Sequence, residues 1–176
     1  MKNMIGKKTV MMLTLALVNF GAFSQHDHGN HGDKKEMSQQ IDPKFEDKDF
    51  GNPYSHYILL KESLVRSHSQ EAKEAVNNLQ QSLAIVENAT SAQAEASKVA
   101  SASNLDEQRK AFASLSNEMT KLVKAKSLVM GEIYLKHCPM ANGNGGAYWL
   151  SSQKEIRNPY FGDKMMKCGS VNETIN

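Results

Sequence analysis

Apolar residues recur every three or four positions through the middle of this chain, and this spacing limits its fold more than any other feature. The clearest stripe comprises Ala72, Val76, Leu79, Leu83 and Val86, with Glu, Lys, Asn and Gln on the remaining faces. Such a pattern places one apolar face along a helix and leaves the other faces to solvent. The sequence therefore predicts an amphipathic helix that packs against other helices.

Similar patterns flank this stripe on both sides. A helix that begins near Pro53 carries Tyr57, Leu60 and Leu64 on one face. A later helix follows Asn104 and Glu107, which have the spacing of a capping box, and its apolar side is formed by Leu105, Phe112, Leu115, Met119 and Leu122. The Ala- and Ser-rich residues 89–103 either extend the second helix or form a connecting helix. Together these segments predict an up-and-down bundle of three or four helices.

The pattern changes after Ser127. Residues 129–135 alternate enough for a short strand, and residues 142–146 read Asn-Gly-Asn-Gly-Gly, which is typical of a loop. Both cysteines, the single tryptophan and the string Asn-Pro-Tyr-Phe-Gly at 158–162 fall in this last third. We therefore expect a mainly α protein in which residues 129–176 form a loop-rich lobe with one or two short β-strands.

The first 24 residues have the three parts of a cleavable signal peptide. Three lysines precede an apolar run over residues 9–20, and small residues stand just before Gln25. The run is shorter than the roughly 20 apolar residues of a permanent span, and no cysteine follows the cleavage point to carry a lipid. These features predict an exported, periplasmic protein without stable membrane insertion.

Residues 25–50 are polar and carry both charges without an apolar period. They predict a disordered, His-bearing tail or linker. Residues 51–176 are then expected to form a single domain.

Charge and motifs argue against two classes of function. The formal net charge is +2, and removal of the three leader lysines leaves about −1, with the remaining lysines interspersed among acidic residues. The chain has no continuous stripe of basic residues, so the sequence does not predict a nucleic-acid partner. The chain also lacks the Gly-x-Ser-x-Gly, P-loop, dinucleotide, His-Glu-x-x-His and Cys-x-x-Cys patterns, so we do not expect an enzyme.

Two short strings combine a thiol with a nearby thioether. The first is His137-Cys138-Pro139-Met140, and the second contains Met165, Met166 and Cys168. Soft sulfur ligands select soft ions such as Cu(I) and Ag(I), and imidazole also suits copper. If the strings converge, the two cysteines act as thiolate ligands, the methionines as thioether ligands and His137 as an auxiliary ligand.

Alternatives remain open at this stage. The two cysteines enclose a loop of about 30 residues, and a disulfide across it would contribute roughly 3–4 kcal/mol in an exported domain. They are otherwise two unrelated thiols. The histidines of the tail, His26, His28 and His31, form a possible second metal site or belong to an ordinary polar linker.

The C-terminal strings resemble those of a known family. Cys-Pro-Met-Ala at 138–141, Gly-Gly-Ala-Tyr-Trp-Leu-Ser at 145–151, Glu-Ile-Arg-Asn-Pro-Tyr-Phe-Gly at 155–162 and Met-x-x-Cys-Gly at 165–169 carry the likeness. They resemble an uncharacterised periplasmic domain, found alone or appended to the adaptor (membrane-fusion) subunits of heavy-metal efflux pumps of the resistance–nodulation–division class. The resemblance implies a mostly helical domain associated with copper or silver, with Cys138, Met140 and Cys168 on its sulfur-bearing strings.

The sequence thus predicts a periplasmic protein that binds Cu(I) or Ag(I) and scavenges it or delivers it to an efflux adaptor or another periplasmic metal carrier. The alternative is an interaction module without a metal site, stapled by a Cys138–Cys168 disulfide and presenting Trp149, Tyr160 and Phe161.

Overall fold

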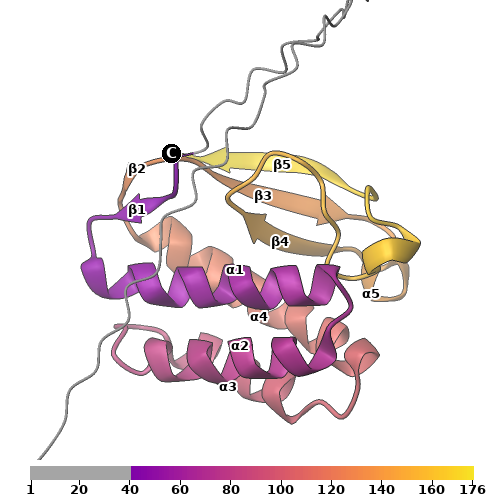
Figure 1. Ribbon diagram of the computed structural model, residues 1–176. Helices are drawn as coiled ribbons and strands as arrows, with labels where there is room; N and C mark the ends of the chain where they lie inside the picture. The colour runs from indigo at the N-terminus through magenta and orange to yellow at the C-terminus, as the bar shows by residue number, and fades with distance from the viewer. Residues whose placement is uncertain (1–40) are drawn as a thin grey trace, which may run out of the picture. The chain divides into compact units, whose positions relative to one another are not determined.

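Four long helices form the larger part of the domain in the computed structural model, which describes residues 41–176. They are α1 (Gly51–Val65), α2 (Ser69–Leu83), α3 (Thr90–Ser101) and α4 (Leu105–Ala125). Each helix packs against the next along the chain (Figure 1). This arrangement confirms the mainly α fold and the helical bundle.

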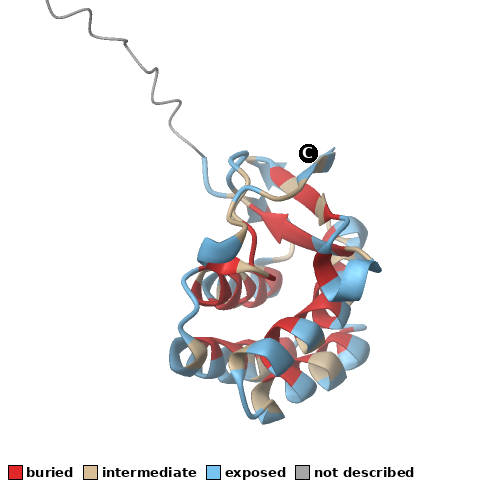
Figure 2. Cartoon of the chain, turned by 90° about the vertical axis from the view of Figure 1, so that its right-hand side faces the viewer, coloured by how far each residue is buried: buried red, intermediate tan, exposed pale blue. Residues whose placement is uncertain are grey.

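The apolar stripes become the buried faces of these helices. Leu60, Leu79, Phe112 and Met119 are all fully buried, and Figure 2 shows the buried faces of the helices turned toward the interior of the bundle. Residues 89–103 form the separate helix α3, because Asn88 adopts a left-handed backbone with φ of 64° and interrupts the chain after α2.

Helix α4 begins with a variant of the predicted capping box. The Asn104 side chain accepts a hydrogen bond from the Glu107 amide at 3.0 Å. The Glu107 carboxylate accepts hydrogen bonds from the amide and hydroxyl of Ser103, at 2.9 and 2.7 Å, so the second half of the box is shifted back by one residue.

The C-terminal lobe contains more strands than expected. Strands β3 (Ile133–Cys138), β4 (Ala147–Ser151) and β5 (Ser170–Ile175) form an antiparallel sheet in the order β4-β3-β5. The predicted strand over 129–135 is divided between β2 (Leu128–Met130) and β3. Gly131 separates them with a φ of +82°, and a Cβ there would lie 2.9 Å from the Ile41 carbonyl oxygen. Short elements α5 (Ala141–Asn144) and η2 (Gly162–Lys164) lie in the connections.

The predicted tail over 25–50 extends too far toward the domain. Residues of strand β1 (Lys44–Phe45) pair with β2, and the 3₁₀ helix η1 (Lys48–Phe50) leads into α1. Phe45 and Phe50 are buried, and their ring centroids lie 4.8 Å apart in an edge-on arrangement. Their burial brings residues 44–50 into the folded domain, which therefore starts before residue 51. The predicted signal peptide and residues 25–40 lie outside the described residues.

One tyrosine joins three elements of the core. Tyr57 on α1 is fully buried, and its hydroxyl forms a hydrogen bond of 2.8 Å with Ser116 Oγ on α4. The Leu150 amide donates to the same hydroxyl at 3.0 Å. Because β4 is an edge strand, Tyr57 satisfies a backbone amide that no neighbouring strand reaches, and the sheet is thereby joined to the bundle.

Within residues 41–176, no helix combines the length and apolar character that crossing a membrane requires.

Replacement of Tyr57 by Phe tests this junction. The variant leaves the Leu150 amide without a partner in the core and removes one hydrogen bond of the Ser116 hydroxyl, so we expect the free energy of unfolding to fall by about 1–3 kcal/mol. Urea denaturation followed by circular dichroism measures the change. Tyr134→Phe is the matched control, because its hydroxyl bonds only to the exposed Glu132 carboxylate. Equal stability of Y57F and the original chain would contradict this account.

Candidate functional site

The two cysteines meet at one end of the three-stranded sheet. Cys138 is the last residue of β3, and Cys168 lies two residues before β5. His137 pairs with Ser170 in the antiparallel register, which brings the turn before β5 alongside the end of β3. The two Sγ atoms lie 3.0 Å apart, and both cysteines are free thiols. The two sulfur-bearing strings thus come together at their cysteines.

The two thiols differ in exposure. Cys138 is fully buried beneath the sheet, whereas Cys168 is half-buried in its turn. The hydrogen bond with Cys138 raises the pKa of the Cys168 thiol, and desolvation adds to the rise. The contact with Cys138 thus favours the protonated form of the Cys168 thiol.

Asn158 holds the turn that carries Cys168. This asparagine is fully buried, and its Nδ2 donates to the Cys168 carbonyl oxygen at 2.8 Å. Its backbone amide donates to the Met166 carbonyl oxygen at 2.9 Å. Its Oδ1 accepts hydrogen bonds from the amides of Tyr160 and Phe161, at 2.8 and 3.3 Å. Residues 158–162 therefore hold the turn that carries Cys168, and we call this segment the clamp.

Gly169 allows this turn to approach β3 closely. Its φ is +129°, and a Cβ at this position would lie 2.7 Å from the His137 carbonyl oxygen and 2.8 Å from Trp149 Cη2. Both contacts are shorter than a side chain tolerates, and the backbone conformation itself favours glycine. Steric contacts and backbone conformation thus explain why a glycine follows Cys168.

The other predicted ligands stand within three residues of a cysteine in the sequence and differ in their exposure. The His137 ring packs against Tyr148, with ring centroids 4.4 Å apart, and neighbouring strand residues point to opposite faces. Met140 is 47% exposed, and Met165 and Met166 are half-buried. In the part of the chain that the structure describes, no three His, Cys, Asp or Glu residues gather as a metal cluster. The tail histidines His26, His28 and His31 lie outside that part.

Arg109 fastens the clamp to the helical bundle. This α4 residue is buried, and its Nε donates to the Pro159 carbonyl oxygen at 3.0 Å. Its Nη2 donates to the Leu64 carbonyl oxygen and to Ser67 Oγ, both at 2.9 Å. Burial lowers the pKa of the guanidinium, and nearby acidic residues partly offset this. Arg109 was not predicted as a functional residue, because an arginine among the polar residues of an amphipathic helix has the pattern of a surface residue.

Aromatic side chains fill the space between the lobe and the bundle. Trp149 is fully buried, and its ring meets Tyr160 edge-on with centroids 6.0 Å apart. Tyr160 also packs against Phe112 of α4 at 5.8 Å. These two aromatic residues therefore serve packing rather than an exposed surface, and only Phe161 of the predicted trio is partly exposed.

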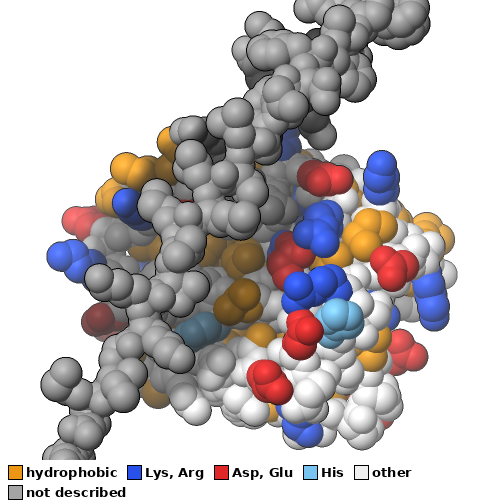
Figure 3. Space-filling view, viewed as in Figure 1, with side chains coloured by type: hydrophobic (Ala, Val, Ile, Leu, Met, Phe, Trp, Pro, Cys, Tyr) orange, Lys and Arg blue, Asp and Glu red, His pale blue; other side chains and the backbone are white. Residues whose placement is uncertain are grey.

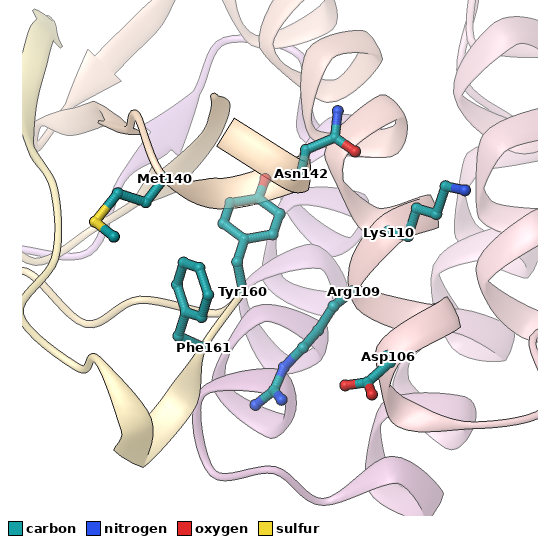
Figure 4. Close-up of a pocket in the computed structure, with 8 residues that line it drawn as sticks. Asp106, Arg109, Lys110, Met140, Asn142, Tyr160 and Phe161 are labelled. Carbon is teal, nitrogen blue, oxygen red and sulfur yellow. The ribbon is translucent and has the colours of Figure 1, made fainter. Parts of the chain in front are cut away.

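A cleft of about 520 Å³ lies between α4 and the C-terminal lobe (Figure 4). It is lined by Asp106, Arg109 and Lys110 from the helix and by Met140, Asn142, Gly143, Tyr160 and Phe161 from the lobe. Both signs of charge and both sulfur-bearing and aromatic groups reach it. Met140 of the first cysteine string thus lines the cleft, whereas neither cysteine is among its lining residues.

A second group of ionisable residues lies beneath the sheet. Lys61 and Lys136 are almost completely buried. Lys61 pairs with Glu62, which also binds Arg157 at 2.7 Å, and Lys136 donates to the Glu155 carbonyl oxygen. Burial, followed by the charge of Lys61, lowers the pKa of Lys136 to about 8. The sequence analysis did not identify this group.

The surface carries both charges in alternation. On the face seen in Figure 3, Lys and Arg side chains are interspersed with Asp and Glu over the part drawn in colour. Several charged side chains of the described residues are paired, such as Arg66 with Glu71 at 2.5 Å. The charged side chains on this face therefore do not form a large patch of a single sign.

Replacement of Asn158 by Ala tests the clamp. Two amides and one carbonyl lose their buried partners, so we expect a loss of unfolding free energy of about 2–4 kcal/mol. Asn158→Asp keeps the acceptor oxygen, and at a pH low enough to protonate its carboxyl it also keeps a donor toward the Cys168 carbonyl, so under that condition it should retain more stability than Asn158→Ala. Thermal and urea denaturation of both variants measure the order. The reverse order would show that the contacts with Tyr160 and Phe161 are not the principal ones.

Lys136 provides a prediction on pH. Its pKa is about 8 in the folded protein and about 10.4 when unfolded, so between these values the unfolded chain binds more protons and stability rises with pH. We expect the original chain to gain stability relative to Lys136→Met from pH 8 to 10, by at most about 1.4 kcal/mol per pH unit. Urea denaturation across this range measures the difference, and a constant difference would refute the assignment.

Comparison with known proteins gives one family match. Residues 54–131 match the model of the family described as a protein of unknown function, DUF3347. The match covers the helical bundle and β2 and ends before β3, so the thiol pair lies outside it. No curated protein matches the chain, and neither does any solved structure.

Proposed function

We propose that this protein binds a soft monovalent metal ion, Cu(I) or Ag(I), through Cys138 and Cys168 and passes it on. The observation that carries the proposal is the approach of the two Sγ atoms to 3.0 Å from strings that lie far apart in the sequence. Thiolates and thioethers are the ligands that Cu(I) prefers. The ion is cargo that is bound and released rather than a resident cofactor.

The thiol pair can accept an ion after a small movement. A metal–thiolate bond is about 2.3 Å long, so two thiolates on one ion stand about 4 Å apart when trigonal and about 4.6 Å apart when linear. The present separation of 3.0 Å must therefore open. Cys138 is held in a paired strand, whereas Cys168 lies in a half-buried turn. The movement is thus expected from Cys168.

Neighbouring groups would complete the coordination. Met165 and Met166 of the second string supply soft, uncharged thioethers, and Met140 of the first string offers an exposed thioether that an ion can meet before it reaches the cysteines. His137 would act as an auxiliary ligand only after its ring leaves Tyr148. His26, His28 and His31 would form a separate and weaker site, because an unstructured segment must be ordered when it binds.

The location and partners belong to the same proposal. The leader over residues 1–24 would direct the chain to the periplasm, and the resemblance of the C-terminal strings supports a metal-efflux adaptor or another periplasmic metal carrier as the recipient. A half-exposed Cys168 beside an exposed Met140 suits such a transfer, since a partner can replace these ligands one at a time. Binding and delivery require no catalytic group.

A second candidate rests on the same contact. Closing the sulfurs by about 1 Å would form a disulfide, whose S–S bond is about 2.05 Å long, and an oxidising compartment favours this bond. The protein would then be a stapled interaction module. Because Trp149 and Tyr160 are buried, its contact surface would depend on Phe161 and Met140 rather than on the aromatic trio.

Titration with Cu(I) separates the two candidates. The reduced chain, carrying Ala at positions 26, 28 and 31 to remove the tail histidines, is titrated anaerobically against a chromogenic Cu(I) chelator. We expect one equivalent to bind and to protect both thiols from alkylation. Cys138→Ser and Cys168→Ser should each weaken binding by about 100-fold, the upper range for loss of a group that supports a metal.

The number of free thiols in protein isolated from its own compartment is the measurement that can contradict metal binding. A quantitative Cys138–Cys168 disulfide that persists in the presence of Cu(I) would reject metal binding and favour the stapled module. Cysteine variants that bind Cu(I) as tightly as the original chain would also reject the thiol pair as the site.

A further inference from the structure

Met140 is the most exposed of the sulfur-bearing side chains near the thiol pair. It is 47% exposed, whereas Cys138 is fully buried and Cys168 is half-buried. The chain turns sharply just after it, because Asn142, Gly143 and Asn144 have φ values of 52°, 64° and 67°. The Gly146 amide closes this turn on the Ala141 carbonyl oxygen at 3.0 Å. Met140 is thus held at an outward corner.

The lobe side of the cleft is formed by segments that also hold the two cysteines in place. Met140 stands two residues after Cys138, and Figure 4 shows it opposite Phe161 and Tyr160 on the lobe side of the cleft. The amides of those two aromatic residues bind Asn158 Oδ1, and the other end of this side chain binds the Cys168 carbonyl oxygen. The lobe side of the cleft is therefore built from the segments that position the two thiols.

An ion that approaches the thiol pair has to reach a buried sulfur. The two Sγ atoms are in contact at 3.0 Å, so they leave no space for the ion until they separate. A thioether carries no proton, whereas each thiol must release one when it binds a metal. Met140 can consequently bind an ion before the thiol pair has opened.

We propose that Met140 is the capture ligand of this protein: a Cu(I) or Ag(I) ion arriving through the cleft binds first to its thioether and then moves to Cys138 and Cys168. This inference rests on the proposed metal-binding function. In the transfer, the two metal–thiolate bonds form, the two S–H bonds break, both protons leave to solvent and the bond to Met140 is released. The metal keeps its oxidation state.

A capture ligand has a kinetic signature. It lowers the barrier for ions that enter and for ions that leave, so its removal slows both steps and changes the equilibrium little. A resident ligand instead contributes to affinity, and its loss speeds release. Met130 is a matched control, because it is 45% exposed on β2 and does not line the cleft.

Stopped-flow mixing tests the inference on the reduced full chain with Ala at positions 26, 28 and 31. Cu(I) is supplied as its weak acetonitrile complex, and the ultraviolet absorption of Cu(I)–thiolate bonds reports arrival at the cysteines. Release is followed by transfer to an excess of chromogenic chelator. We expect Met140→Leu to slow uptake and release alike, by about tenfold, with the dissociation constant nearly unchanged, and Met130→Leu to alter neither rate.

Two results would overturn the capture role while the proposed function stands. If Met140→Leu weakens binding with an unchanged uptake rate, Met140 is a resident ligand. If neither rate changes, the cleft plays no part in capture. Failure of the original chain to develop thiolate absorption at all would reject the metal-binding function itself, and the inference with it.

Discussion

The placement of the C-terminal lobe depends on the buried guanidinium of Arg109. Its three hydrogen bonds reach the end of α1, the turn before α2 and the Pro159 carbonyl of the lobe. All three acceptors are neutral, so the cost of burying the charge is met by hydrogen bonds and by the more distant attraction of Asp106 and Asp163. Gly162 packs against the same guanidinium, where a Cβ would lie 2.7 Å from Nη2. The position of the clamp around Asn158, and hence of Cys168, follows from this side chain.

The contact between the two thiols is therefore a property of the fold rather than of a bound ion. The β3–β5 register brings the two strings together, Asn158 fixes the turn, and Gly169 permits the close approach. Sulfurs at 3.0 Å lie between the spacing of a disulfide and that of two thiolates on one ion. Under the proposed function, small movements in opposite directions would lead to these two states, and redox conditions and metal supply would select between them.

The parts of the fold that were predictable from the sequence are those with a local period. The stripes of α2 and α4 became buried faces because a helix repeats every 3.6 residues. Phe45 and Phe50 gave no such signal, since charged residues surround them and each is buried by contacts with distant segments. The cysteines were identified from ligand chemistry alone. Asn158 and Arg109 were not, because their importance comes from backbone groups that only the folded chain brings within reach.

The family match ends between the helical bundle, which holds the lobe in place, and the segments that carry the sulfur-bearing residues. Residues 54–131 include Tyr57 and Arg109, two of the side chains that attach the lobe to the bundle. Cys138, Met140 and Cys168 all lie beyond residue 131. The matched bundle thus supplies a surface on which a lobe can be fixed, and the sulfur chemistry belongs to the lobe. A chain that shares only the bundle would share the attachment points and not the thiol pair, so a function for this protein has to be argued from β3, the clamp and the turn before β5.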